Sequence, residues 1–283
     1  MRQTTAAMRT LFLVAAVLVA LAGIQLFVFS SRTDHYFSWT IGIPLTAAFL
    51  GAGYWASVPL EWLSGRERVW ARCRPAVFGV FVFTALTLVA TLLHFDLFHF
   101  GDEFRLSTQV VTWAWLAIYI AVPVLFVLVL SDQLRQPGGD PPRAYPLPPW
   151  MRAAMAAQAA VMLALGAPLF IAPERAASWW PWPLTPLTGR AVGAWLVALA
   201  VIAAQSVLEN DLTRLRSVLI SQVVLIVLQL LALARYPDSV DWTPEGWIYL
   251  SFLLGLLLIG VYGVIQGVRN NAFAPSTAPG SDP

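Results

Sequence analysis

The chain has 283 residues, of which 59% are hydrophobic and only 11% are charged. About a quarter of the residues of a soluble domain are charged, so this composition excludes a mainly water-exposed surface and indicates a protein whose solvent is lipid. A net charge of +2, with no basic segment interleaved with aromatic residues, gives no reason to expect a nucleic-acid partner.

Eight apolar segments are long enough to cross a bilayer as helices, since the hydrocarbon core needs about 20 apolar residues. Helices are expected because lipid offers no hydrogen-bond partner to an unpaired backbone group. The sequence therefore predicts an all-α polytopic membrane protein with eight transmembrane helices. The predicted spans are residues 10–30, 39–58, 76–95, 107–130, 152–172, 190–208, 217–235 and 247–268.

The segments between these spans differ in charge. All 17 basic residues are arginines, and most of them fall on the side of the two termini. The positive-inside rule then places both termini in the cytoplasm of a multi-pass protein of the cell membrane. The sequence "SWWPWP" (178–183) falls on the outer side, where Trp179, Trp180 and Trp182 are predicted to form an aromatic belt at the lipid boundary.

Polar residues repeat at a fixed offset of 142 positions along the chain. Apolar matches carry little weight in a membrane protein, so the polar and proline matches make the case. They indicate two four-helix repeats, each with an even number of spans, related by a pseudo-twofold axis along the membrane normal. Pro44, Leu45 and Thr46 fall on Pro186, Leu187 and Thr188; Glu67 on Glu209; Arg72 and Arg74 on Arg214 and Arg216; Asp96 on Asp238; and Glu103 on Glu245.

The duplication divides the chain into four parts. The first four-helix repeat covers residues 1–132 and the second covers 151–270. Between them, residues 133–150 form a linker whose proline and glycine content predicts a semi-rigid cytoplasmic spacer. Residues 271–283 are predicted to be a disordered tail.

The densest polar cluster is "HFDLFHFGDEFR" (94–105), in the outer loop after the third span. Imidazole and carboxylate groups together are able to bind a divalent metal. The alternative, which we favour, is a solvated acidic loop whose carboxylates lie near helix starts, because the second half keeps only the carboxylates. We therefore predict no metal. The cluster comprises His94, Asp96, His99, Asp102 and Glu103, with Asp238, Asp241 and Glu245 in the second half.

Two further polar sets stand out. Arg72, Arg74, Arg214 and Arg216 are predicted to anchor the cytoplasmic side by reaching lipid phosphates, the alternative being a specific site for anionic lipid or a partner protein. Inside the spans lie Thr84, Thr87, Thr91, Gln222 and Gln229, which either join helices by hydrogen bonds or line a polar path.

No motif indicates a catalytic residue or a cofactor. The chain lacks a P-loop, a G-x-S-x-G elbow, HExxH and a dinucleotide fingerprint, and its single cysteine, Cys73, excludes an internal disulfide. No Asp, Glu or Arg is predicted at the centre of a span, which argues against a proton-coupled pump.

Two functions compete on this basis. The first is a non-enzymatic protein, either permease-like or the partner of a membrane complex, that acts in the lipid bilayer on a small-molecule or lipid substrate or on another membrane protein. The alternative is an outer-face enzyme that acts on a lipid or lipid-linked substrate through the His94–Glu103 loop. A cavity between the halves that is lined by Gln222, Gln229 and the threonines favours the first function. A pocket where His94, Asp96 and Glu103 converge favours the second.

The arginine distribution predicts that residues 140 and 283 both face the cytoplasm. Reporter fusions at these two positions, one active only in the cytoplasm and one only outside it, measure this directly. An external signal at either position contradicts the predicted orientation.

Overall fold

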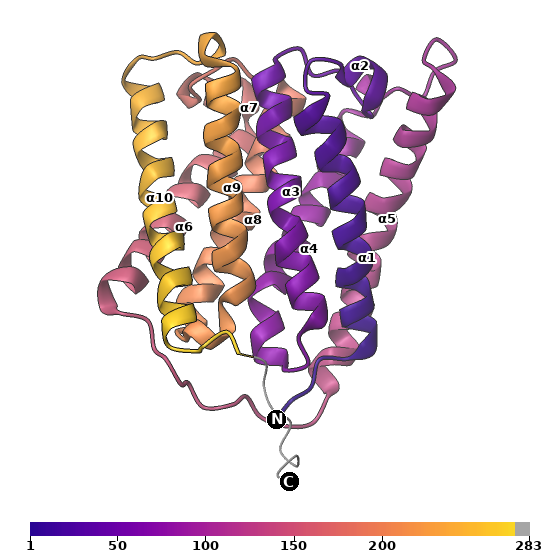
Figure 1. Cartoon of the computed structure of the whole chain (residues 1–283). Coiled ribbons are helices and arrows are strands. Elements are labelled where there is room, and N and C mark those ends of the chain that lie inside the picture. The colour runs from indigo at the N-terminus through magenta and orange to yellow at the C-terminus, as the bar shows by residue number, and fades with distance from the viewer. Residues whose placement is uncertain (275–283) are drawn as a thin grey trace.

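The computed structural model describes residues 1–274, and every element of secondary structure in this part of the chain is a helix (Figure 1). Long helices run roughly parallel to one another and are joined by short turns and short helices at the two ends. The elements are α1 (Ala6–Gly23), η1 (Ile24–Val28), α2 (Thr33–Tyr36), α3 (Pro44–Arg66), α4 (Trp70–Leu93), η2 (Phe95–Leu97), α5 (Leu106–Arg135), α6 (Pro149–Ile171), α7 (Pro173–Ala176), η3 (Ala177–Trp179), α8 (Pro186–Glu209), η4 (Leu212–Arg214), α9 (Arg216–Arg235), η5 (Pro237–Ser239) and α10 (Pro244–Arg269).

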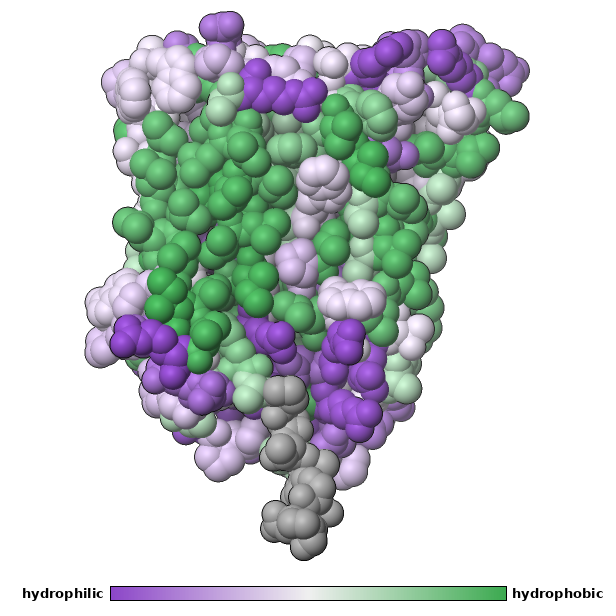
Figure 2. Space-filling model, in the orientation of Figure 1, coloured by the Kyte–Doolittle hydropathy of each residue, from purple (hydrophilic) through white to green (hydrophobic). Residues whose placement is uncertain are grey.

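Seven of these helices are long and apolar enough to cross a membrane, counting within the described residues. They are α1 with η1, α4, α5, α6, α8, α9 and α10. Their apolar side chains form a band between two polar ends on the face seen in Figure 2. The prediction of a helical, multi-span membrane protein is therefore confirmed.

Helix α3 is the long helix that does not meet this apolar criterion. It runs over Pro44–Arg66, whereas the predicted span was 39–58. Pro44 occupies the first turn, where its missing N–H leaves no bond unmade. Pro59 lies inside the helix without ending it, as membrane helices allow when neighbouring groups satisfy the freed backbone atoms. The predicted span, which ended before Pro59, therefore left out residues 59–66, the last two turns of the helix.

Helices α3 and α8 form the centre of the bundle. Helix α3 packs against α1 and α9, and α8 packs against α6 and α4. Helices α5 and α10 lie at the edges, where α5 packs against α4 and α10 packs against α9. The N-terminus, the end of α10 and the segment 136–148 all lie at the same end of the bundle (Figure 1).

Two glycines allow the central helices to approach their neighbours closely. A Cβ atom built on Gly51 of α3 would lie 2.5 Å from the backbone nitrogen of Phe27. A Cβ atom on Gly193 of α8 would lie 2.7 Å from the backbone nitrogen of Phe170. Both contacts are with backbone, which cannot rotate away as a side chain can. Any larger residue would therefore push α3 away from η1, or α8 away from α6.

The segment between α5 and α6 is tied across one end of the bundle by hydrogen bonds. The carboxylate of Asp211 accepts the backbone N–H groups of Ala144 and Tyr145 at 2.8 and 3.3 Å. The guanidinium of Arg143 donates to the carbonyl of Glu209 at 2.9 Å. Gly138 has a φ of 105°, a left-handed conformation that favours glycine. Helix α5 extends to Arg135 and α6 begins at Pro149, so only residues 136–148 of the predicted linker are non-helical.

Two other predicted regions differ from the structure. Trp179 is exposed, but Trp182 is only 2% exposed and its indole N–H donates to Thr46 Oγ1 at 2.9 Å. Trp180 is also buried, so only Trp179 suits a lipid-facing belt. Ala272, which belongs to the predicted tail, is buried in a turn, and its backbone N–H donates to the Gly267 carbonyl at 2.9 Å. Residues 275–283 of that tail lie outside the described residues.

The close approaches predict that Gly51→Ala and Gly193→Ala each destabilise the protein. Overpacking a tight contact costs about 1–3 kcal/mol, which lowers the thermal unfolding temperature measured in detergent. Gly255→Ala in α10 is the control, because a Cβ there meets nothing within 4 Å and alanine favours a helix over glycine. Equal effects of the three substitutions would contradict the packing argument.

Candidate functional site

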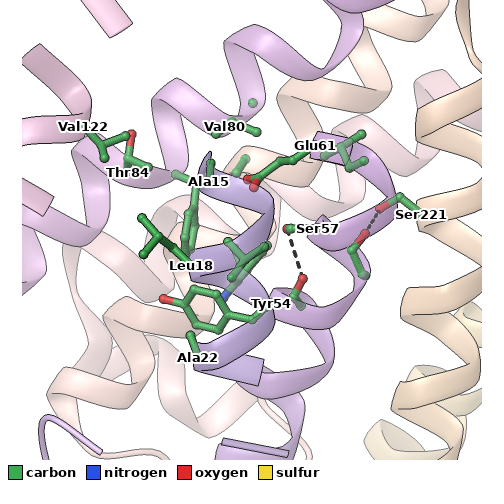
Figure 3. Close-up of a pocket in the computed structure, with 18 of the residues that line it drawn as sticks. Ala15, Leu18, Ala22, Tyr54, Ser57, Glu61, Val80, Thr84, Val122 and Ser221 are labelled. Carbon is green, nitrogen blue, oxygen red and sulfur yellow. Dashed lines mark hydrogen bonds between the residues drawn. The ribbon is translucent and has the colours of Figure 1, made fainter. Parts of the chain in front are cut away.

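A cavity of ≈ 100 Å³ lies inside the bundle, between the central helices and their neighbours. Its walls come from α1, α3, α4 and α5 of the first half of the chain, and from α8 and α9 of the second half. We call it the central cavity. Tyr54, Ser57 and Glu61 follow one another at i, i+3 and i+7 on α3, so they share one helix face, and all three line the cavity (Figure 3).

Glu61 is the one charged residue among those that line the central cavity. Its side chain is 2% exposed, and its carboxylate points toward the other lining residues (Figure 3). The Oε2 atom has no hydrogen-bond partner. A buried carboxylate without a partner is costly, and no Arg, Lys or His lines the cavity to offset it.

Several hydroxyl groups of the cavity are hydrogen-bonded to the protein. The hydroxyls of Tyr54 and Tyr119 lie 2.6 Å apart. Ser57 donates to the carbonyl of Gly53 at 3.1 Å, and Thr84 donates to that of Phe81 at 3.0 Å. Among the charged side chains of the described residues, Glu61 is the one that lines this cavity, and its Oε2 has no hydrogen-bond partner.

Aromatic rings form much of the remaining wall. The rings of Phe83 and Trp195 have centroids 4.0 Å apart, and Tyr54 meets Trp195 edge-on at 5.3 Å. Trp115 and Tyr119 are 4.4 Å apart. The indole N–H of Trp115 is satisfied by Thr91 Oγ1 at 3.1 Å, so this residue brings π-surface to the cavity without an unpaired donor.

Comparison with known proteins adds nothing to this chemistry. No protein family, curated protein or solved structure matches the chain. The cavity must therefore be interpreted from its own residues. Its combination of one unpaired carboxylate, bonded hydroxyls and aromatic walls suits the binding of a small molecule that is mostly apolar. It offers no nucleophile activated by a neighbouring base, which covalent catalysis needs.

The predicted polar path is only partly brought together. Thr84 lines the central cavity, whereas Gln229 and Gln222 line two separate cavities of ≈ 30 Å³ each. The amide of Gln229 donates to the Phe49 carbonyl at 3.2 Å, and that of Gln222 donates to the Leu256 carbonyl at 2.8 Å. Both glutamines thus join helices. Thr87 and Thr91 are buried on α4, and Thr91 donates to the Thr87 carbonyl at 2.8 Å.

The outer-loop cluster does not converge on one point. No group of three or more metal-ligating side chains occurs within residues 1–274. His94 Nε2 lies 2.6 Å from a guanidinium nitrogen of Arg190. The carboxylates are all exposed, and Glu245 lies in the first turn of α10, where it accepts from Thr243 at 2.7 Å. These exposed carboxylates are Asp96, Asp102, Glu103, Asp238, Asp241 and Glu245.

His99 has a structural environment. It is 2% exposed, its Nδ1 lies 3.0 Å from the Phe37 carbonyl and its Nε2 lies 3.0 Å from Thr40 Oγ1. A neutral ring that donates from Nδ1 and accepts at Nε2 satisfies both contacts. Burial lowers the pKa of His99, although the Phe37 carbonyl works against this. The ring therefore holds the loop to the segment before α3.

Three of the four predicted anchor arginines bind protein groups at the linker end. Arg74 and Arg214 both bind the carboxylate of Glu209, at 2.6 and 2.8 Å. Arg72 donates to the Ala274 carbonyl at 2.9 Å. Burial raises the pKa of Glu67, and the positive charge of Arg216 works against that rise. Arg74 and Arg214 thus bind the protein itself rather than pointing to lipid.

Sequence reasoning missed Glu61, and with it the site. The predicted second span ended at residue 58, which placed Glu61 in a loop. The structure puts it inside α3, five residues before the helix ends, and against the cavity. The signal that was available is the i, i+3, i+7 spacing of Tyr54, Ser57 and Glu61, which continues through Pro59.

The environment of His99 predicts a pH-dependent stability. Because the pKa is lowered in the folded state, the unfolded chain binds the proton more tightly, so stability falls as the pH drops below about 6.5, the ordinary pKa of histidine. His94, whose pKa is lowered by burial and by Arg190, acts in the same direction. Thermal unfolding of wild type between pH 7.5 and 5.0 should show the loss. His99→Gln should reduce it, and the variant that also carries His94→Gln should reduce it further; unchanged slopes contradict the assignment.

Proposed function

We propose that the protein is a permease-like, non-enzymatic protein of the cell membrane, built from two parallel four-helix repeats with both termini in the cytoplasm. In this arrangement α3 is the eighth span. It lies in the bundle beside the seven apolar helices, and its more polar residues are buried against them. The central cavity, which is lined mostly by the first half and completed by α8 and α9 of the second, carries the functional part of the proposal.

Equivalent helix contacts support the duplication. At the offset of 142 residues, α3 corresponds to α8 and α4 corresponds to α9. The pair α3–α9 then mirrors α8–α4, and the pair α1–α3 mirrors α6–α8. Gly51 and Gly193, which make the two close backbone approaches, are also equivalent. Gly53 and Trp195 are equivalent and touch each other, which is expected of residues beside a pseudo-twofold axis.

Equivalent charges support it as well. Glu209 binds Arg214 of its own half and Arg74 of the other half. Glu67, its counterpart, is influenced by Arg72 of its own half and Arg216 of the other half. Exchanging the two halves converts one set into the other. A parallel axis produces this exchange because both sets then lie at the same end of the bundle.

The position of the cavity favours transport. Substrate sites of transporters built from repeats lie near the bilayer midplane, at the interface between the repeats. The central cavity is lined by both halves and by residues from the middle of several long helices. A purely structural partner of a membrane complex needs no such cavity.

The outer-face enzyme has less support from the geometry. His99 is engaged by Phe37 and Thr40, and His94 by Arg190. A general base must be within reach of a substrate proton, and His99 is 2% exposed. Both histidines of the loop are therefore engaged by other parts of the protein, whereas the carboxylate of Glu61 has no basic residue beside it in the central cavity.

The permease-like function predicts that the central cavity opens to each side of the membrane in turn. Cys73 is the single cysteine, so a Cys73→Ala background carrying Ser57→Cys has one thiol in the cavity. A membrane-impermeant methanethiosulfonate should modify it in right-side-out and in inside-out vesicles. Labelling from one side alone, or from neither, contradicts alternating access.

Ser206→Cys in the same background is the matched control. Like Ser57, Ser206 is buried in a central helix and donates to the carbonyl four residues earlier, Ile202 at 2.8 Å. It does not line the central cavity. We expect it to stay unmodified from both sides, so that labelling at position 57 reports the cavity and not general loosening of the bundle.

A further inference from the structure

The central cavity combines one unpaired carboxylate with aromatic walls and contains no basic residue. We propose that it binds a small alkylated ammonium cation, with Glu61 as the counter-charge. This rests on the proposed function, because it names the class of molecule that the permease would carry.

The charge argument begins with Glu61. An ionised carboxylate that is 2% exposed needs a positive partner or must take up a proton. Arg, Lys and His are absent from the residues that line the cavity, so the protein supplies no such partner. A cationic ligand in the cavity supplies the positive charge.

The walls distinguish an organic cation from a metal ion. Calcium and magnesium require about six or more oxygen ligands, and Glu61 is the one carboxylate at the cavity. Trp115, Tyr119 and Trp195 provide instead the aromatic surface that attracts alkylated ammonium groups by cation–π interactions.

The size of the cavity limits the ligand. A protein cavity of roughly 150 Å³ accommodates benzene, which has six heavy atoms. By the same measure ≈ 100 Å³ accommodates about four or five heavy atoms. Tetramethylammonium, with one nitrogen and four methyl groups, has this size and presents an apolar surface around its charge.

The test measures tetramethylammonium chloride binding to the purified full-length protein in detergent, by isothermal titration calorimetry. Sodium chloride at the same ionic strength is the reference. tert-Butanol, a neutral molecule with the same number of heavy atoms, reports binding that depends on shape alone. We expect wild-type protein to bind tetramethylammonium at least tenfold more tightly than tert-butanol. No binding, or equal binding of the two, overturns the proposal without requiring any variant.

Glu61→Gln tests the residue itself. Glutamine has the same shape and no charge, so it keeps the packing and avoids burying an ion. We expect at least a tenfold loss of tetramethylammonium affinity. Glu174→Gln, the same change at an exposed position on α7, should leave affinity unchanged. Equal affinity of Glu61→Gln and wild type overturns the assignment of Glu61.

Uptake of labelled tetramethylammonium into proteoliposomes separates this inference from the proposed function. Binding with uptake supports both. Binding without uptake, together with labelling of Ser57→Cys from one side only, supports the cation site and contradicts the permease. Labelling of Ser57→Cys from both sides without any tetramethylammonium binding supports the permease and overturns the cation site.

Discussion

Helix α3 can exist in this protein only while other helices surround it. It is the long helix that is not apolar enough to face lipid, and one of its faces carries Tyr54, Ser57 and Glu61. In a bilayer such a face is tolerated when it is buried in protein or lines a cavity. The glycine at position 51 lets η1 cover one side of α3, and α9 covers another. The central cavity lies where no neighbouring side chain packs against that polar face.

The same requirement explains how the two halves are joined. At the linker end, Glu209 is held between Arg74 and Arg214. At the opposite end, Trp182 donates to Thr46, a neutral bond. Charge-assisted hydrogen bonds are roughly twice as strong as neutral ones. Arg235 also donates to the Phe27 carbonyl at that end, at 2.8 Å, so charged groups join the two halves at both ends of the bundle.

The sequence predicts the scaffold better than the site. Long apolar runs place seven helices to within a few residues, because their lengths are set by the bilayer. The ends of α3 could not be placed in this way, since Pro59 and Glu61 are usual signs of a helix end. The partners of His99 and Trp182 also escaped prediction, because both lie on segments distant in sequence. Burial by tertiary contacts decided these residues, and no local pattern reports it.

The proposed duplication gives the cavity residues a further meaning. At the offset of 142, five polar or aromatic residues that line the cavity in the first half correspond to apolar residues in the second half. Tyr54 corresponds to Leu196, Ser57 to Leu199, Glu61 to Ala203, Thr84 to Ile226 and Tyr119 to Val261. The scaffold positions behave differently, since Gly51 and Glu67 keep their identity in Gly193 and Glu209. A residue that only stabilises the repeat is needed in both halves. A residue that serves the cavity is needed only where it lines it, and of these counterparts only Leu199 lines the central cavity as well. The asymmetry therefore falls at the residues that give the cavity its polar and aromatic lining.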